Sequence, residues 1–259
     1  MRANTERWPL DRPGSEAYGA LVGDCREALA RDGMFSLAGF VDPSAAQALA
    51  SLFEPRFQTE AFAHRRSHNI YFRDDVPGLS PDHGALKRME TANRTLCADQ
   101  IAGPLTELYR WPPLARFLAD CLGKAALFTM ADPLAAVNVM RYGAGEALNW
   151  HFDRSEFTTT LLLQTPEAGG AFEYRAGLRT DDNPNHDGVA RLLAGQDEEV
   201  RQVHLAPGTL NVFRGKNTAH RVTPSRGEVP RVIAVFSYFE EPQVAFTEAE
   251  RMGFYGRAG

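Results

Sequence analysis

The second half of the chain contains a series of short β-rich segments, and this series restricts the fold more than any other feature. Each segment ends at a cluster of Gly, Pro or Asp, as strands commonly do. The segments cover residues 126–130, 135–142, 158–164, 171–175, 201–205, 209–213 and 231–238. About eight strands that follow a block of helices predict an α+β protein with a sandwich or jelly-roll core, covered by helices on one face.

The first half of the chain shows helical patterns instead. Apolar residues recur at helical spacing over residues 15–33, 42–53, 86–108 and 112–123, with a short extended segment at 34–37. The pattern is lost between residues 57 and 84, where we expect a long loop or lid, because long loops in compact domains are often functional. Residues 177–196 are expected to form a loop insertion with one helical turn.

Neither an internal repeat nor a linker divides the sequence, so we expect a single domain over residues 1–259. Within it, residues 1–125 would be mainly helical support and lid, 126–240 the β core, and 241–259 a C-terminal tail.

Composition excludes several classes of function. The net charge is −5 and no run of basic residues stands out, which argues against a nucleic-acid partner, because phosphate binding needs clustered Lys and Arg. Three cysteines without a C-x-x-C pair indicate free buried thiols in a reducing compartment. No segment has the ~20 apolar residues of a membrane span, and the N-terminus lacks a signal-peptide core. We therefore expect a cytoplasmic protein with no membrane partner.

Asn149-Trp150-His151-Phe152-Asp153, taken together with His220, provides a candidate metal site. Residues i and i+2 of a strand point to the same side, so His151 and Asp153 can converge on one ion. Two His and one carboxylate form the facial ligand set of non-haem Fe(II) and leave about three octahedral positions open. The triplet alone is weak, since such triplets often arise by chance and His151 is then a surface or structural histidine beside a turn aspartate.

A second group of residues lies downstream in a β-branched run. Strand alternation places Arg231, Ile233, Val235 and Ser237 on one face. A guanidinium and a hydroxyl on the same face can bind a carboxylate through charge-assisted, bidentate hydrogen bonds.

These residues carry a family resemblance. His151, Asp153, His220, Arg231 and Ser237 resemble the H-x-D…H…R-x-S pattern of the Fe(II)/2-oxoglutarate-dependent dioxygenases. Segments 149–153, 167–174, 213–215 and 220–224 are similar to the branch of free amino-acid hydroxylases and lysine-type radical halogenases, over roughly residues 85–240.

The resemblance implies a double-stranded β-helix, jelly-roll or cupin-like, that uses Fe(II), 2-oxoglutarate and O2. His151, Asp153 and His220 would hold iron, and Arg231, helped by Ser237, would bind the distal carboxylate of 2-oxoglutarate. Polar residues on neighbouring strands would complete this site or simply line the barrel, and the candidates are Asn138, Tyr142 and Gln164.

Asp153 narrows the expected reaction. Halogenases of this kind carry Gly or Ala at this position, because chloride binds iron only where a protein carboxylate is absent. The resemblance therefore implies hydroxylation of an unactivated C–H bond, with succinate and CO2 as co-products. Desaturation or ring closure remains an alternative outcome.

For an amino-acid-like substrate, Arg88 or Arg94, expected on a helix, would bind the α-carboxylate unless it belongs to a solvated helix face. Arg154, next to Asp153, indicates an anionic or strongly polar group on the substrate if it turns toward the iron. Trp150 and Phe254 are candidate pocket walls, the latter if the tail at 251–255 folds back.

Two other classes compete with the oxygenase. A non-catalytic cupin-like metal or ligand sensor would not need Arg231 in register. A zinc hydrolase would need a general base, for which Glu156 is the nearest candidate. The oligomeric state, monomer or homodimer, stays open.

Overall fold

Two antiparallel sheets build the centre of the protein, described over residues 1–259 by a computed structural model. The large sheet contains, in spatial order, β1 (Met34–Leu37), β11 (Leu210–Phe213), β7 (Thr158–Gln164), β14 (Arg231–Phe236), β5 (Val137–Tyr142), β3 (Met89–Leu96) and β2 (Phe62–His68). The small sheet contains β10 (Arg201–Val203), β9 (Phe172–Arg175), β12 (Ala219–Val222) and β6 (Leu148–His151). Two short ladders complete the strands: β8 (Ala168–Gly169) pairs with β13 (Ser225–Arg226), and β4 (Phe128–Thr129) with β15 (Tyr238–Phe239).

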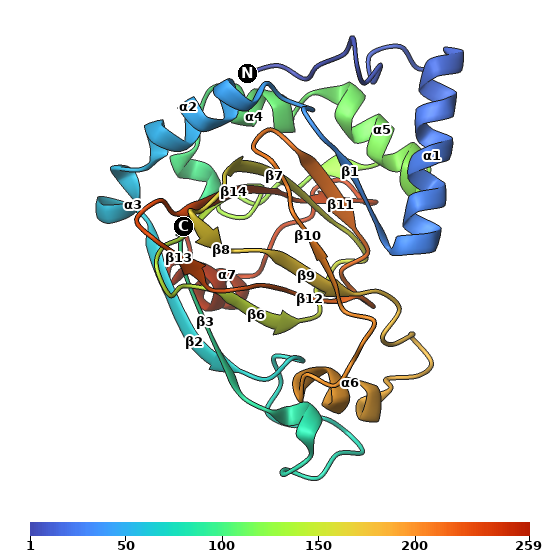
Figure 1. Cartoon of the computed structure of the whole chain (residues 1–259). Helices are drawn as coiled ribbons and strands as arrows, with labels where there is room; N and C mark the ends of the chain where they lie inside the picture. Colours follow the sequence, from blue (N-terminus) through green and yellow to red (C-terminus); the bar gives the residue numbers. More distant parts are fainter.

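Helices cover one side of the large sheet, where Figure 1 shows α1 (Glu16–Asp32), α2 (Pro43–Phe53), α4 (Pro104–Tyr109) and α5 (Pro112–Leu122). The other helical elements are α3 (Arg56–Thr59), η1 (Gly84–Leu86), η2 (Ala98–Gln100), α6 (His186–Leu193) and α7 (Glu248–Tyr255). This arrangement confirms the predicted α+β double-stranded β-helix with helices on one face. No helix is both long and apolar enough to cross a bilayer.

Side chains alternate between the two faces of β14. One face packs in the apolar core, and the other faces the space between the two sheets. Val232, Ala234 and Phe236 belong to the 36-residue apolar cluster shared with α1, α2 and α5. Arg231 and Ile233 point the opposite way, into the space between the sheets.

The first helix follows the local rules that predicted it. The Ser15 hydroxyl accepts from the Tyr18 amide, which caps α1 at its start. Gly33 ends the helix with φ of 73°, a left-handed conformation that glycine adopts without strain.

The prediction of a helix over residues 86–101 was wrong, since this segment forms strand β3 followed by η2. The strand's inward residues are polar but buried, with Thr91, Asn93 and Thr95 each at most 5% exposed. The apolar residues of this segment recur at helical spacing. Their pattern hid the alternation of the buried polar residues at every second position, which is the signal of a strand.

The expected lid at 57–84 is shorter than predicted. Its first part contains the end of α3 and strand β2, whose exposure alternates residue by residue, so only residues 69–83 form a loop.

The C-terminal tail also contains helix α7, and its Tyr255 hydroxyl donates to the Asn138 side chain at 2.9 Å. In the 177–196 insertion, α6 is longer than the predicted single turn.

Candidate metal and co-substrate site

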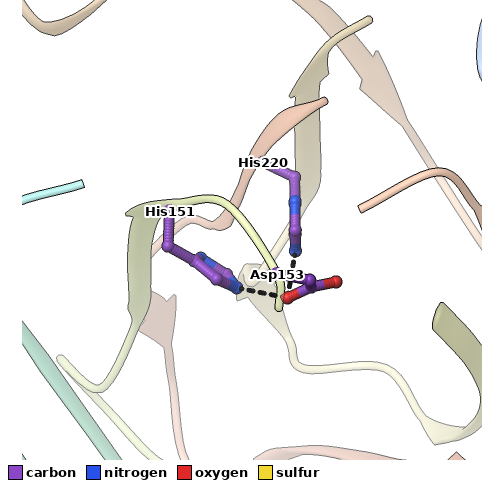
Figure 2. Close-up of side chains that lie close together, drawn as sticks. All are labelled: His151, Asp153 and His220. Atoms are coloured by element: carbon purple, nitrogen blue, oxygen red, sulfur yellow. Dashed lines mark ion pairs between the residues drawn. The ribbon is translucent and has the colours of Figure 1, made fainter. Parts of the chain in front are cut away.

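Three predicted ligands meet between the sheets (Figure 2). His151 is the last residue of β6 and pairs directly with His220 of β12. Asp153 Oδ1 lies 3.4 Å from Nε2 of each histidine, and the candidate ligand atoms all lie within 4.8 Å of one another. Asp153 does not continue the strand as predicted: it follows the end of β6, and its amide donates to the Gly215 carbonyl at 3.1 Å.

Backbone carbonyls orient both histidines. His151 Nδ1 lies 2.9 Å from the Asn149 carbonyl, and His220 Nδ1 lies 3.0 Å from the Thr218 carbonyl. A carbonyl only accepts, so each Nδ1 carries the proton and each Nε2 presents its lone pair to the site. Both rings are therefore held in the tautomer that a metal ligand requires.

The site is electrostatically prepared for a cation. Burial by itself would raise the pKa of Asp153, but the two neighbouring histidines, His220 above all, bring that pKa well below its usual value. Burial lowers the pKa of His151, whereas the Asp153 charge outweighs burial and raises the pKa of His220. An ionised carboxylate beside two imidazoles fits a divalent transition metal.

Arg231 is a buried cation that lacks a partner. Its side chain is 3% exposed, and neither Nε nor Nη2 has a hydrogen-bond partner. Burial lowers the pKa of its guanidinium to about 10. A buried, unpaired charge is costly, and a guanidinium fork matches a carboxylate bidentately. The orphaned nitrogens therefore fit the distal carboxylate of 2-oxoglutarate.

The other co-substrate candidates separate into two groups. Tyr142 pairs in register with Arg231, shares its face and is buried. Asn138 is already engaged, because its amide donates to the Leu134 carbonyl and its oxygen accepts from Tyr255.

The side chains of Ser237 and Gln164 are also engaged, because each donates a hydrogen bond to a backbone carbonyl. Ser237 lies beyond the end of β14, and its hydroxyl donates to the Ala135 carbonyl at 3.0 Å. The Gln164 amide donates to the Pro230 carbonyl.

The predicted substrate arginines do not gather at the metal site. Arg88 donates to Ser67 and Asp74 near the surface, rather than standing on a helix. Arg94 is on the outer face of β3 and donates to the Phe57 carbonyl.

Trp150 faces away from the ligands, and Arg154 is engaged at the surface. Because Trp150 precedes His151 on β6, it points to the opposite side, where its ring lies 4.8 Å from the Arg221 guanidinium carbon. Arg154 is exposed, pairs with Glu250 of α7 at 2.9 Å and lies over the Phe254 ring.

Glu156, the base that a zinc hydrolase would need, is occupied elsewhere. Its carboxylate pairs with Lys124 at 2.6 Å and is half exposed. The structure therefore offers no support for the hydrolase.

Strand β2 contributes residues that the sequence analysis missed. His64, Arg66 and His68 alternate along its inward face. Arg66 forms no ion pair, and burial, with Arg154 nearby, lowers its pKa. Polar residues at every second position could have identified this strand face, but a search for apolar periodicity does not detect that pattern.

Phe72 connects this strand to the metal ligands. Its ring stacks on His68 with centroids 4.3 Å apart, meets His151 edge-on at 5.8 Å and carries the Arg66 guanidinium at 4.5 Å. The φ of Phe72 is 54°, which is rare for a residue with a bulky side chain. Backbone strain of this kind concentrates at functional sites.

Solved structures share this fold at low sequence identity. HygX from Streptomyces hygroscopicus, with nickel and 2-oxoglutarate bound, has a TM-score of 0.56 and 13% identity, covering 83% of this chain and 85% of HygX. The 2-oxoglutarate-dependent epimerase SnoN of nogalamycin biosynthesis has a TM-score of 0.55 and 13% identity, covering 85% and 84%. A Pseudomonas putida prolyl-4-hydroxylase has a TM-score of 0.51 and 16% identity, covering 83% and 98%.

Fold, ligand triad and buried arginine together define the class, an Fe(II)/2-oxoglutarate-dependent oxygenase. Within it, the chain belongs to the Halogenase D family, which it matches over residues 20–251. A sequence search of curated proteins found no significant match.

Proposed function

We propose that this protein is a single-domain oxygenase that hydroxylates an unactivated C–H bond of a free amino acid or similar small molecule, and that releases succinate and CO2 from 2-oxoglutarate. His151, Asp153 and His220 hold Fe(II), and Arg231 binds the distal carboxylate of 2-oxoglutarate with Tyr142 beside it. With O2, this metal and co-substrate supply the oxidising power. The observation that carries the proposal is the unpartnered, buried Arg231 in the same fold as the triad.

Asp153 favours hydroxylation over halogenation, despite the family's name. Its carboxylate occupies the coordination position that a halide would need. Desaturation or ring closure on a modified amino acid is the second candidate outcome, because both begin with removal of the same hydrogen.

Arg66 replaces Arg88 and Arg94 as the proposed anchor for a substrate carboxylate. It is the inward, ion-pair-free cation of β2, and it lies next to Phe72, which contacts the metal ligand His151. Phe254 of α7 is the proposed wall beside it, because Phe254 contacts Arg154, which lies near Arg66.

The proposal is tested by mixing protein, Fe(II) and 2-oxoglutarate without oxygen, then admitting air in the presence of each of a panel of free amino acids. We expect one or more amino acids to increase succinate release and to gain the mass of one oxygen atom. Loss of two hydrogens instead would favour desaturation or ring closure. Binding of 2-oxoglutarate without succinate from any substrate would favour a sensor, and no binding of 2-oxoglutarate would refute the oxygenase.

Replacing Arg66 with Gln should raise the KM for the accepted amino acid about tenfold to a hundredfold, because a hydrogen bond to a charged group contributes about 1.5–3 kcal/mol. The metal and 2-oxoglutarate affinities should be unchanged. Arg65→Gln is the matched control, since Arg65 is adjacent but points outward and pairs with Glu90. Equal KM values for the two variants would remove Arg66 from the substrate site.

A further inference from the structure

The two oxygens of the Asp153 carboxylate have different surroundings. Oδ1 faces the histidines, at 3.4 Å from each Nε2. Oδ2 points away from them and accepts a hydrogen bond of 2.5 Å from the Thr158 hydroxyl. Only Oδ1 is therefore directed toward the position of the metal.

Gly215 closes the space on the Oδ2 side. A Cβ atom at Gly215 would overlap Oδ2, and it would also crowd the Asp153 Cγ and Cβ atoms. The Gly215 carbonyl also accepts from the Asp153 amide at 3.1 Å. The Asp153 side chain thus packs directly on the Gly215 backbone, and the Asp153 amide is hydrogen-bonded to the same residue.

The start of β7, an inner strand of the large sheet, sets the position of Thr158. It is the first residue of β7 and pairs with Phe213 of β11, which ends two residues before Gly215. The same strand pair therefore delivers both the hydroxyl and the glycine to one carboxylate. Turning Oδ2 toward the metal would therefore break its hydrogen bond to Thr158.

We propose that Thr158 and Gly215 are positioning residues that keep Asp153 a one-oxygen ligand, so that a six-coordinate metal retains three open positions. A two-oxygen carboxylate would remove one of these positions, which 2-oxoglutarate and O2 need together. The inference rests on the proposed metal-binding function, but it concerns ligand geometry and is independent of the substrate.

The test uses Mn(II) alone, without 2-oxoglutarate or amino acid. Thr158→Val should bind Mn(II) about 10- to 100-fold more weakly than the wild type, the usual effect of losing a partner of a metal ligand. It should also show fewer exchangeable water ligands on the bound Mn(II) by electron–nuclear double resonance. Thr158→Ser, which retains the hydroxyl, should recover both values.

Thr159→Val provides the matched control. Thr159 is the neighbouring buried threonine, faces the other side of β7, and its hydroxyl has no hydrogen-bond partner. Its Mn(II) affinity and water count should equal those of the wild type. If Thr158→Val also equals the wild type in both measurements, the proposed role of Thr158 is wrong.

Gly215 is tested by thermal unfolding of the metal-free protein in a double-mutant cycle. Gly215→Ala should lower the Tm of the wild type, whereas in the Asp153→Gly background, where the overlapping side chain is gone, the same change should have little effect. An equal loss of Tm in both backgrounds would refute the packing role. Because neither experiment uses a substrate, failure of the amino-acid proposal would leave these outcomes unaffected.

Discussion

Arg231→Met should weaken 2-oxoglutarate binding by about 100-fold or more while stabilising the protein in the absence of 2-oxoglutarate. Both effects have the same cause. In the free protein the buried guanidinium has two unpartnered nitrogens, and each buried unsatisfied group costs about 1–3 kcal/mol. Methionine fills a similar volume without charge. The co-substrate carboxylate then loses its partner, and breaking a buried charge pair costs about 3–5 kcal/mol.

Two measurements check this prediction. Calorimetric titration of the Mn(II)-loaded protein should show the loss of 2-oxoglutarate affinity, and thermal unfolding without 2-oxoglutarate should show an increased Tm. The control is Arg141→Met, because Arg141 stands on the neighbouring strand β5 but pairs outward with Glu54. This control should lose stability and keep its 2-oxoglutarate affinity. Unchanged affinity in Arg231→Met would remove Arg231 from the co-substrate site.

Asp153→Asn should weaken divalent-metal binding by about 100-fold or more and abolish oxygenation. The substitution preserves size but removes the negative charge at the ligand site. Unit charges 4 Å apart interact with about 4 kcal/mol at an effective dielectric constant of 20, and about 1.4 kcal/mol corresponds to a factor of ten. Titration with Mn(II) or Co(II) measures the effect directly.

A buried carboxylate elsewhere serves as the control for that experiment. Asp197 is 10% exposed in its side chain and pairs with Arg175. Asp197→Asn should affect stability and leave metal affinity intact. Metal affinity in Asp153→Asn within a few-fold of the wild type would mean that the carboxylate is not a ligand.

The sequence was sufficient to predict that His151, Asp153 and His220 lie together, because the chemistry of such a ligand set is specific even when its secondary structure is not. His151 and His220 are far apart in sequence, yet they pair directly across β6 and β12. The prediction that Asp153 shares a strand with His151 was wrong, but the bend after β6 still brings its carboxylate to the same point.

The proposed substrate side could not be predicted in the same way, because its residues are polar and yet partly or fully buried. Hydrophobic periodicity detects strands whose buried face is apolar. In β2 and β3 the inward face is polar, so Arg66 was missed and Arg94 was assigned to a helix. Because β3 is a strand, the alternation of its side chains places Arg94 on the face that points away from the site.

One remaining difference is a small error in a strand end. Ser237 was placed on the face of Arg231 by extending β14 one residue beyond Phe236, where it ends. Helix α7 ends at Gly256 in a left-handed conformation and begins with a capping box between Thr247 and Glu250. These local signals were present in the segment first expected to be a tail.

The position of β1 at the edge of the large sheet has a consequence for how the chain folds. Met34 pairs with Phe213, so this strand, made early by the ribosome, has no partner until most of the protein has been synthesised. Pairings between residues so distant in sequence close large loops and slow folding. During that interval the apolar faces of α1 and α2 lack the sheet that covers them. We therefore expect nascent or refolding chains to depend on dilution, low temperature or chaperones to avoid aggregation.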